Sequence, residues 1–163
     1  MINKPKSQKT NGQQLKTMKT LKFTTQINAP KEKVWNVLWG KESYKAWTKA
    51  FAEGSDVKTD WNEGSSVWFT DGSDCGMYSI IDKKIPNKQM TFKHLGILKD
   101  GKELPPDDKA NSWSGGIEDY QLSEQNGITT INVALDSTDE HKDYFEESFP
   151  KALNIVKKLS EQS

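Results

Sequence analysis

Polar and apolar residues alternate over 21–27, and this period of two predicts a half-buried β-strand. After Pro30 the spacing of apolar residues changes to three and four. This spacing predicts a helix over 30–39, with Pro30 at its first position. A second short helix is predicted over 41–47, where Tyr44 and Trp47 face the same side.

Alternation returns after Glu53, and turn residues divide the region that follows into short segments. Asn126-Gly127 is a typical two-residue hairpin turn. Residues 96–116 are polar and rich in Pro, Gly and Asp, which predicts a long functional loop or an excursion off the sheet. The predicted strands are 57–61, 67–69, 76–85, 90–94, 117–122 and 128–135.

The last patterned stretch predicts a long helix. Ser137 and Glu140 match a capping box, with Ser137 as N-cap. Apolar residues then recur every three or four positions to Leu159, and Pro150 predicts a kink or a restart near Phe149. The order of strand, two helices, about six antiparallel strands and long helix predicts an α+β fold, in which the last helix covers one face of a curved sheet.

Length and charge limit the classes of protein. The 163 residues fit one domain, and the 23 cationic residues, all lysine, balance 23 acidic ones. A chain without arginine lacks the planar group that reads phosphates and guanine edges, so we expect no nucleic-acid partner. Residues 1–19 hold five lysines and no acid, which predicts a disordered basic tail before one domain over 20–162.

The sequence lacks several motifs that would indicate a membrane span, a catalytic nucleophile, a metal site or a cofactor site. No apolar run is long enough to cross a bilayer, and no apolar segment follows the first lysines, so we expect no membrane span and a cytoplasmic location. The single cysteine, Cys75, lies in a turn without the pattern of a nucleophile elbow. With two distant histidines and no phosphate-binding glycine motif, the sequence predicts no metal and no cofactor.

Six segments together resemble a known family. The region from about 21 to 160 resembles the activator of heat-shock protein 90 ATPase homologue branch of the START-like (SRPBCC) superfamily. The resemblance implies a helix-grip fold, with a curved antiparallel sheet of about six or seven strands around the last helix and an apolar cavity between them. The segments are 27–38 (INAPKEKVWNVL), Trp47, 60–64 (DWNEG), 85–94 (IPNKQMTFKH), 118–122 (EDYQL) with Asn126-Gly127, and 149–153 (FPKAL).

Within that fold, aromatic residues are the candidates to line the cavity, because rings present rigid apolar area and Trp and Tyr add a polar group. His94 and Glu118 share strand parity with aromatic neighbours and are the weak candidates for proton transfer. Taken singly, each candidate fits an ordinary core or structural role better, and His141 is predicted to be exposed. The predicted ligand-binding residues are Trp39, Trp47, Trp61, Trp68, Tyr78, Phe92, His94, Trp113, Glu118, Tyr120 and Phe149.

Three hypotheses of function follow from these residues and the resemblance. The first is a monomeric protein that binds an apolar small molecule, lipid-like or aromatic, in the cavity without catalysis. The second is a cyclase or hydrolase that uses the same cavity, with His94 and Glu118 as its proton-transfer pair. The third is a module that interacts with a chaperone, which a large exposed apolar patch and a missing cavity would favour.

Overall fold

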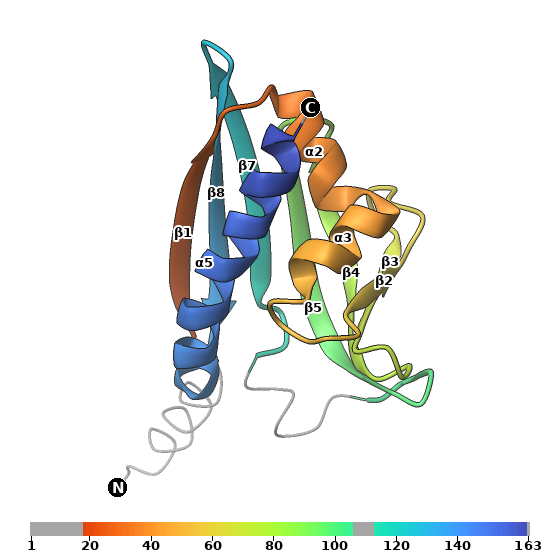
Figure 1. Cartoon of the computed structure of the whole chain (residues 1–163). Helices are drawn as coiled ribbons and strands as arrows, with labels where there is room; N and C mark the ends of the chain where they lie inside the picture. The colour runs from red at the N-terminus through yellow and green to blue at the C-terminus, as the bar shows by residue number, and fades with distance from the viewer. Residues whose placement is uncertain (1–17, 106–112, 163) are drawn as a thin grey trace, which may run out of the picture.

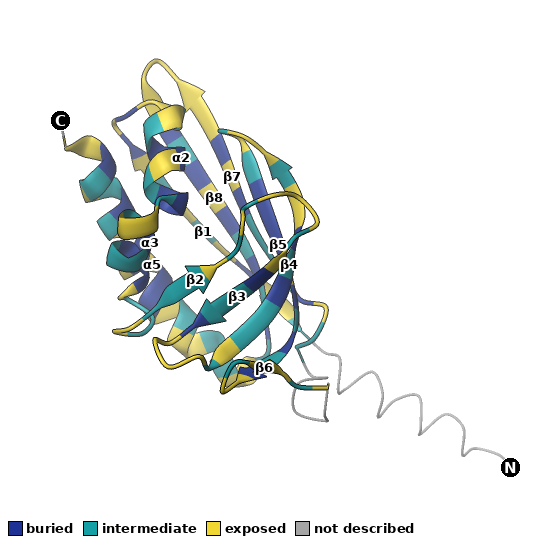
Figure 2. Ribbon diagram, turned by 90° about the vertical axis from the view of Figure 1, so that its right-hand side faces the viewer, coloured by how far each residue is buried: buried dark blue, intermediate teal, exposed yellow. Residues whose placement is uncertain are grey.

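One antiparallel sheet carries the fold. The computed structural model describes residues 18–105 and 113–162, and within them eight strands pair in the order β1-β8-β7-β5-β4-β3-β2, with β6 beside β5. Figures 1 and 2 show the helices on one face of this sheet, as the predicted α+β helix-grip fold requires. The strands are β1 (Lys19–Ile27), β2 (Asp56–Lys58), β3 (Ser66–Thr70), β4 (Gly76–Ile85), β5 (Gln89–Lys99), β6 (Lys102–Glu103), β7 (Ile117–Gln125) and β8 (Ile128–Ser137).

Two short helices follow β1, as predicted. Helix α2 (Lys31–Trp39) buries Val34, Trp35, Leu38 and Trp39, the face that its spacing indicated. The sequence placed Pro30 at the first helical position. In the structure it is the N-cap residue, one position earlier, and the helix begins at Lys31. At Gly40 the chain turns into α3 (Lys41–Thr48), which buries Tyr44, Trp47 and Thr48.

The long helix α5 (Asp139–Glu161) lies along β1 and β8 in Figure 1. Its predicted capping box is wrong: Ser137 is the last residue of β8, and the N-cap is Thr138, which makes no side-chain cap hydrogen bond. The helix continues through Pro150, so the predicted restart is also wrong, while the kink stays a prediction. Burial of Phe149 and Leu153 on either side keeps the helix intact despite the missing backbone donor.

Two strand predictions need correction. Strand β2 ends at Lys58, and Trp61, the last residue of the predicted strand, has a left-handed backbone conformation with φ of 64° that does not fit an extended strand. Strand β5 continues beyond His94 to Lys99 and turns back into β6, so the first part of the predicted loop 96–116 belongs to the sheet. The ten-residue β4 supplies the partner for this extension, since Gly76 pairs with Leu98.

The predicted division into tail and domain lies partly outside the described residues. Residues 1–17 of the predicted tail are not described, and Lys19, which ends that tail in the prediction, begins β1. The extent of the single domain, 20–162, therefore stays a prediction.

The core is unusually rich in aromatic rings and centres on Trp39. Its ring centroid lies 5.1 Å from that of Tyr120, 5.4 Å from Trp61 and 5.5 Å from Phe92. Most of these pairs meet edge to face, the favourable arrangement for rings with a negative face and a positive edge. The aromatic core joins α2 and α3 to strands β5 and β7.

A close backbone approach at Gly76 fixes the start of β4 beside β3. A Cβ at this position would lie 1.9 Å from the carbonyl oxygen of Phe69. We expect Gly76→Ala to lower the free energy of unfolding by about 2 kcal/mol, since the backbone has to move. In the control Gly101→Ala, the added Cβ meets no atom within 4 Å and only the positive φ of 76° opposes it. Equal losses in chemical denaturation of the two variants would contradict this prediction.

Candidate functional site

A pocket of about 470 Å³ lies between the helix-covered face of the sheet and helices α3 and α5. Its rim is formed by the loop after α3, the turn between β3 and β4, and the junction of β8 with α5. The volume lies within the range of small-molecule sites. The aromatic lining residues are Tyr44, Trp47, Phe51, Phe69, Trp113, Tyr120, Tyr144, Phe145 and Phe149.

Ring packing holds the inner wall of the pocket in place. Phe149 of α5 stacks on Phe23 of β1 with 4.8 Å between centroids, and Phe51 meets Phe149 edge to face at the same separation. Trp47 is 1% exposed and donates its Nε1 proton to the carbonyl oxygen of Leu38 over 3.0 Å. These contacts leave the wall little freedom to collapse, because the rings on its far side are already packed.

A hydrogen-bonded cluster forms the polar part of the wall. Glu118 Oε1 lies 3.0 Å from His94 Nε2, and His94 Nδ1 lies 2.7 Å from Ser79 Oγ. The Tyr120 hydroxyl donates to the other carboxylate oxygen of Glu118. A carboxylate only accepts hydrogen bonds, so Nε2 carries a proton, and the Ser79 hydroxyl can donate to or accept from Nδ1. The imidazole is therefore satisfied whether neutral or protonated.

Strand register explains why these four residues meet. Ser79 lies directly opposite His94 across β4 and β5. Phe92 lies opposite Glu118 across β5 and β7, so His94 is two positions from Glu118's partner on the same face. Both His94 and Glu118 line the pocket.

Two tyrosines that line the pocket, Tyr44 and Tyr120, have raised pKa values. Burial raises the pKa of Tyr120 well above its usual value, and the Glu118 carboxylate raises it further by charge repulsion and by its hydrogen bond. Burial also raises the pKa of Tyr44, with smaller contributions from Glu118 and Asp56. Both phenols therefore keep their protons at neutral pH, and that of Tyr120 donates to Glu118.

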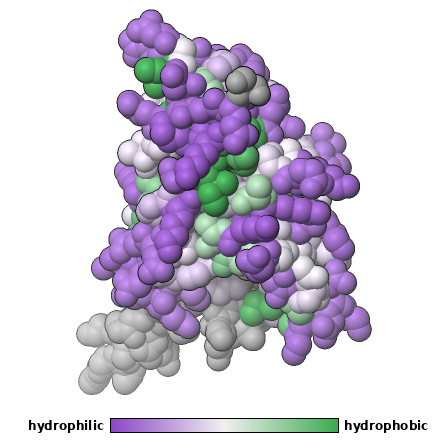
Figure 3. Space-filling model, viewed as in Figure 1, coloured by the Kyte–Doolittle hydropathy of each residue, from purple (hydrophilic) through white to green (hydrophobic). Residues whose placement is uncertain are grey.

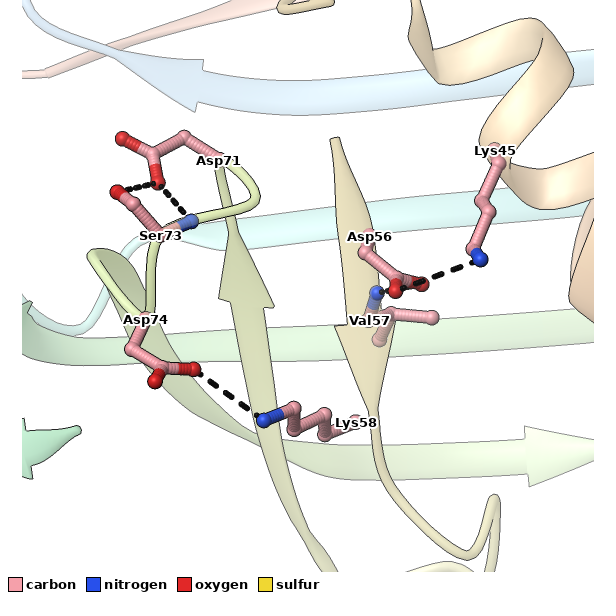
Figure 4. Close-up of polar contacts among 7 residues, drawn as sticks. All are labelled: Lys45, Asp56, Val57, Lys58, Asp71, Ser73 and Asp74. Carbon is pink, nitrogen blue, oxygen red and sulfur yellow. Dashed lines mark hydrogen bonds and ion pairs between the residues drawn. The ribbon is translucent and has the colours of Figure 1, made fainter. Parts of the chain in front are cut away.

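The rim at the β3–β4 turn is held by polar contacts (Figure 4). Asp71 accepts hydrogen bonds from the Ser73 hydroxyl and backbone N–H, and these bonds, the hydroxyl first, hold the pKa of Asp71 below its usual value. Beside the turn, Lys58 pairs with Asp74 at 3.3 Å. Lys45 of α3 lies 3.9 Å from Asp56 of β2 and joins that helix to the edge strand.

Six of the predicted ligand-binding residues line this pocket: Trp47, His94, Trp113, Glu118, Tyr120 and Phe149. Trp39, Trp61 and Phe92 lie outside its lining and pack together in the core.

The remaining two predicted residues, Trp68 and Tyr78, pair with each other across β3 and β4 and point away from the pocket. Trp68 donates to Glu103 Oε2 over 2.8 Å, and the Tyr78 hydroxyl donates to the carbonyl oxygen of Leu104. The Tyr78 ring covers Gly96, where a Cβ would lie 2.6 Å from the tyrosine hydroxyl. Neither residue lines the pocket, so the prediction is wrong for both.

Sequence reasoning missed several lining residues and misjudged one. His141, predicted to be exposed, is half-buried at the rim and lies 3.1 Å from Thr138 Oγ1 through its Nδ1. Its spacing of four from Phe145, and of eight from Phe149, is the signal that places all three on one face of α5. Phe51 and Met77, by contrast, carry no local pattern that points to a pocket.

Residues 18–105 and 113–162 provide neither a metal-binding group nor a membrane-spanning helix. No three His, Cys, Asp or Glu side chains gather there as a metal-binding group. No described helix combines the length and apolarity needed to span a bilayer.

Comparison with known proteins identifies the family. No curated protein matches the chain. Among solved structures, protein MLL2253 from Mesorhizobium loti is 14% identical, with a TM-score of 0.68 over 86% of this chain and 96% of that one. CalU16 from Micromonospora echinospora is 17% identical, with a TM-score of 0.60 over 86% and 73% of the two chains. The Aha1 dimer from Colwellia psychrerythraea is 21% identical, with a TM-score of 0.64 over 88% and 98%.

These likenesses show the fold, and the family follows from a direct sequence match. The model of the family described as "Activator of Hsp90 ATPase homolog 1-like protein" matches residues 28–160, which include most of the sheet and all three described helices. The match agrees with the START-like resemblance drawn from the six sequence segments. The chain belongs to the family of Activator of Hsp90 ATPase homolog 1-like proteins.

Proposed function

We propose that this protein binds a small, largely apolar molecule in the pocket between the sheet and α5. The observation that carries the proposal is the lining itself, in which aromatic rings surround one hydrogen-bonded polar cluster. Binding draws on apolar burial of about 25 cal/mol per Å², offset by the entropy of association. The polar cluster of His94, Glu118 and Tyr120 orients the ligand.

Met77 offers a direct test, because it lines the pocket from β4. We expect Met77→Trp to place an indole in the pocket and weaken binding of 2-(2-naphthyl)ethanol at least about tenfold, as occupied volume excludes the ligand. Ile80→Trp is the matched control, because Ile80 belongs to the same strand but not to the described lining. Isothermal titration calorimetry on wild type and both variants provides the affinities. Equal affinity of wild type and Met77→Trp would contradict the proposal.

A second candidate function is acid–base catalysis in the same pocket. It is favoured by the contact between His94 and Glu118 and by the satisfaction of His94 in either charge state. Such an enzyme would transform a compound in an extract of its own host, and Glu118→Gln would abolish that turnover. Mass spectrometry of extracts incubated with each protein tests it, and an extract unchanged by wild type would contradict it.

A role as a chaperone-interacting module has less support in the described surface. Figure 3 shows apolar side chains along the boundary of α5 with α2 and α3, surrounded by hydrophilic residues. The large exposed hydrophobic residues, Ile85, Ile128 and Tyr144, come from different elements. A surface that docks a partner protein is expected to expose one large contiguous apolar patch, whereas these three residues lie on three separate elements. We therefore base the proposal on the pocket.

A further inference from the structure

The charges that line the pocket indicate which ligands it accepts, an inference that rests on the proposed function. Three carboxylates, those of Asp71, Glu118 and Asp136, lie in the described lining, which contains no lysine. The lining also contains two imidazoles, those of His94 and His141. Counted as formal charges with histidine neutral, these groups give the described lining three negative charges and no positive one. The described wall therefore presents net negative charge to a ligand.

Glu118 is the carboxylate placed deepest in the aromatic wall. Its side chain is 19% exposed, and each oxygen accepts one hydrogen bond, from His94 or from Tyr120. A carboxylate oxygen has two acceptor positions, so each oxygen can accept a further bond from a ligand. Trp47 and Tyr120 also line the pocket, with centroids 6.2 Å apart, and aromatic rings attract cations through their faces.

The two rim carboxylates are held by neutral donors. Asp136 accepts from the Thr20 hydroxyl over 2.7 Å and from the backbone N–H of Ile117 over 3.0 Å. Asp71 accepts from Ser73, as Figure 4 shows. Within residues 18–105 and 113–162, no ion pair joins Asp71, Glu118 or Asp136 to a lysine.

Lysines do lie near the rim, but their ion pairs are with other acids. Lys58 pairs with Asp74 and Lys45 with Asp56. The N-terminal end of α5, where Thr138 and His141 line the pocket, carries the partial positive charge of a helix. Asp139 and Glu140 in its first turn oppose that charge. The negative potential of the three carboxylates therefore dominates the described lining.

We propose that the pocket selects molecules that combine an aromatic or apolar body with an ammonium group, places that group against Glu118, and rejects carboxylates of the same shape. The ammonium donates to the free acceptor positions of Glu118 while the body lies among the rings of α3, β7 and α5. A neutral alcohol of equal shape binds with intermediate affinity, since it donates one hydrogen bond and carries no charge.

Three ligands of one shape separate charge from shape: 2-(2-naphthyl)ethylamine, 2-(2-naphthyl)ethanol and 2-naphthylacetic acid. Calorimetry at neutral pH is expected to give the amine at least about tenfold higher affinity than the acid, with the alcohol between them. In Glu118→Gln the amine loses about tenfold and the alcohol changes less than about threefold. Glu124→Gln is the matched control, because Glu124 lies on the same strand, is exposed, and bonds to the N–H of Lys31 outside the pocket.

The outcomes distinguish the two proposals. If none of the three ligands binds wild type, the proposed function fails. If the alcohol binds and the amine has no advantage over the acid, the function stands and the charge selection is overturned. Equal loss of amine affinity in Glu118→Gln and Glu124→Gln would also overturn it, because the effect would then reflect net charge rather than the pocket.

Discussion

Replacing Trp47 with alanine is expected to lower the free energy of unfolding by about 4 kcal/mol, the scale observed for removal of large buried aromatic side chains. Trp47 is 1% exposed and contacts the rings of Trp39, Tyr44 and Tyr120 edge to face. The substitution also leaves the carbonyl oxygen of Leu38 without its indole donor. Both losses fall where α3, the sheet and the pocket wall meet.

Trp68→Ala is the control for this substitution, because it removes the same side chain from the opposite face of the sheet. Trp68 is half-buried and its indole donates to the exposed Glu103. We expect its loss to cost less than about 2 kcal/mol, since little cavity remains at a surface site. Chemical denaturation followed by circular dichroism measures both values. Similar losses would show that the wall containing Trp47 is not the stable centre of the fold.

Alkaline pH is expected to destabilise the protein steeply. The pKa values of Tyr44 and Tyr120 are raised well above the usual 10.0, chiefly by burial. Above pH 10 the unfolded chain therefore releases protons that the folded protein retains, and stability falls as pH rises. Each phenol contributes up to about 1.4 kcal/mol per pH unit until its folded-state pKa is reached. Below pH 10 neither phenol alters the pH dependence of stability.

Tyr44→Phe separates one of these contributions from the other. The variant keeps the ring and removes one titrating group, so we expect the alkaline slope of the unfolding free energy to decrease by about 1.4 kcal/mol per pH unit. Urea denaturation at a series of alkaline pH values provides the slope. Tyrosinate absorbance of the folded protein provides a second readout. Ionisation of all four tyrosines near pH 10 without unfolding would contradict the argument.

The spacing of apolar residues predicted the order of helices and strands, because the apolar residues of each element lie on its buried face. Strand β4 was predicted with its observed bounds, Gly76–Ile85, and the turn at Asn126-Gly127 joins β7 to β8 as expected. The end of β5 could not be predicted in the same way. Its extension to Lys99 depends on pairing with the start of β4, where Gly76 lies opposite Leu98, and Gly96 interrupts the local alternation within the extension.

Side-chain direction was predictable only where strand register is regular. His94 and Glu118 meet because β5 and β7 pair without interruption from Gln89 to Lys93. In β4 the register shifts between Tyr78 and Ser79 and again between Ile81 and Lys83. The first shift leaves Leu95 of β5 unpaired and the second leaves Asp82 of β4 unpaired, so β4 still alternates regularly from Met77 to Ser79. Alternation therefore separates Tyr78 from Met77, but it does not show which of the two faces is the inner one.

The sequence did not show which aromatic residues line the pocket and which pack within the core. Trp39 and Trp47 are both buried and in contact, yet only Trp47 lines the pocket. Composition cannot separate a ring that packs against other rings from one that borders a space, because both kinds of site favour the same side chains. The distinction comes from long-range packing between α3 and α5.

Native mass spectrometry of the protein purified from its own host tests the central claim most directly. We predict that wild type and the Ile80→Trp control carry a non-covalent small molecule that collisional activation releases, and that Met77→Trp lacks it. Wild type that is empty under the gentlest conditions, or an equal mass excess on Met77→Trp, would contradict the claim that the pocket beside α5 holds a ligand.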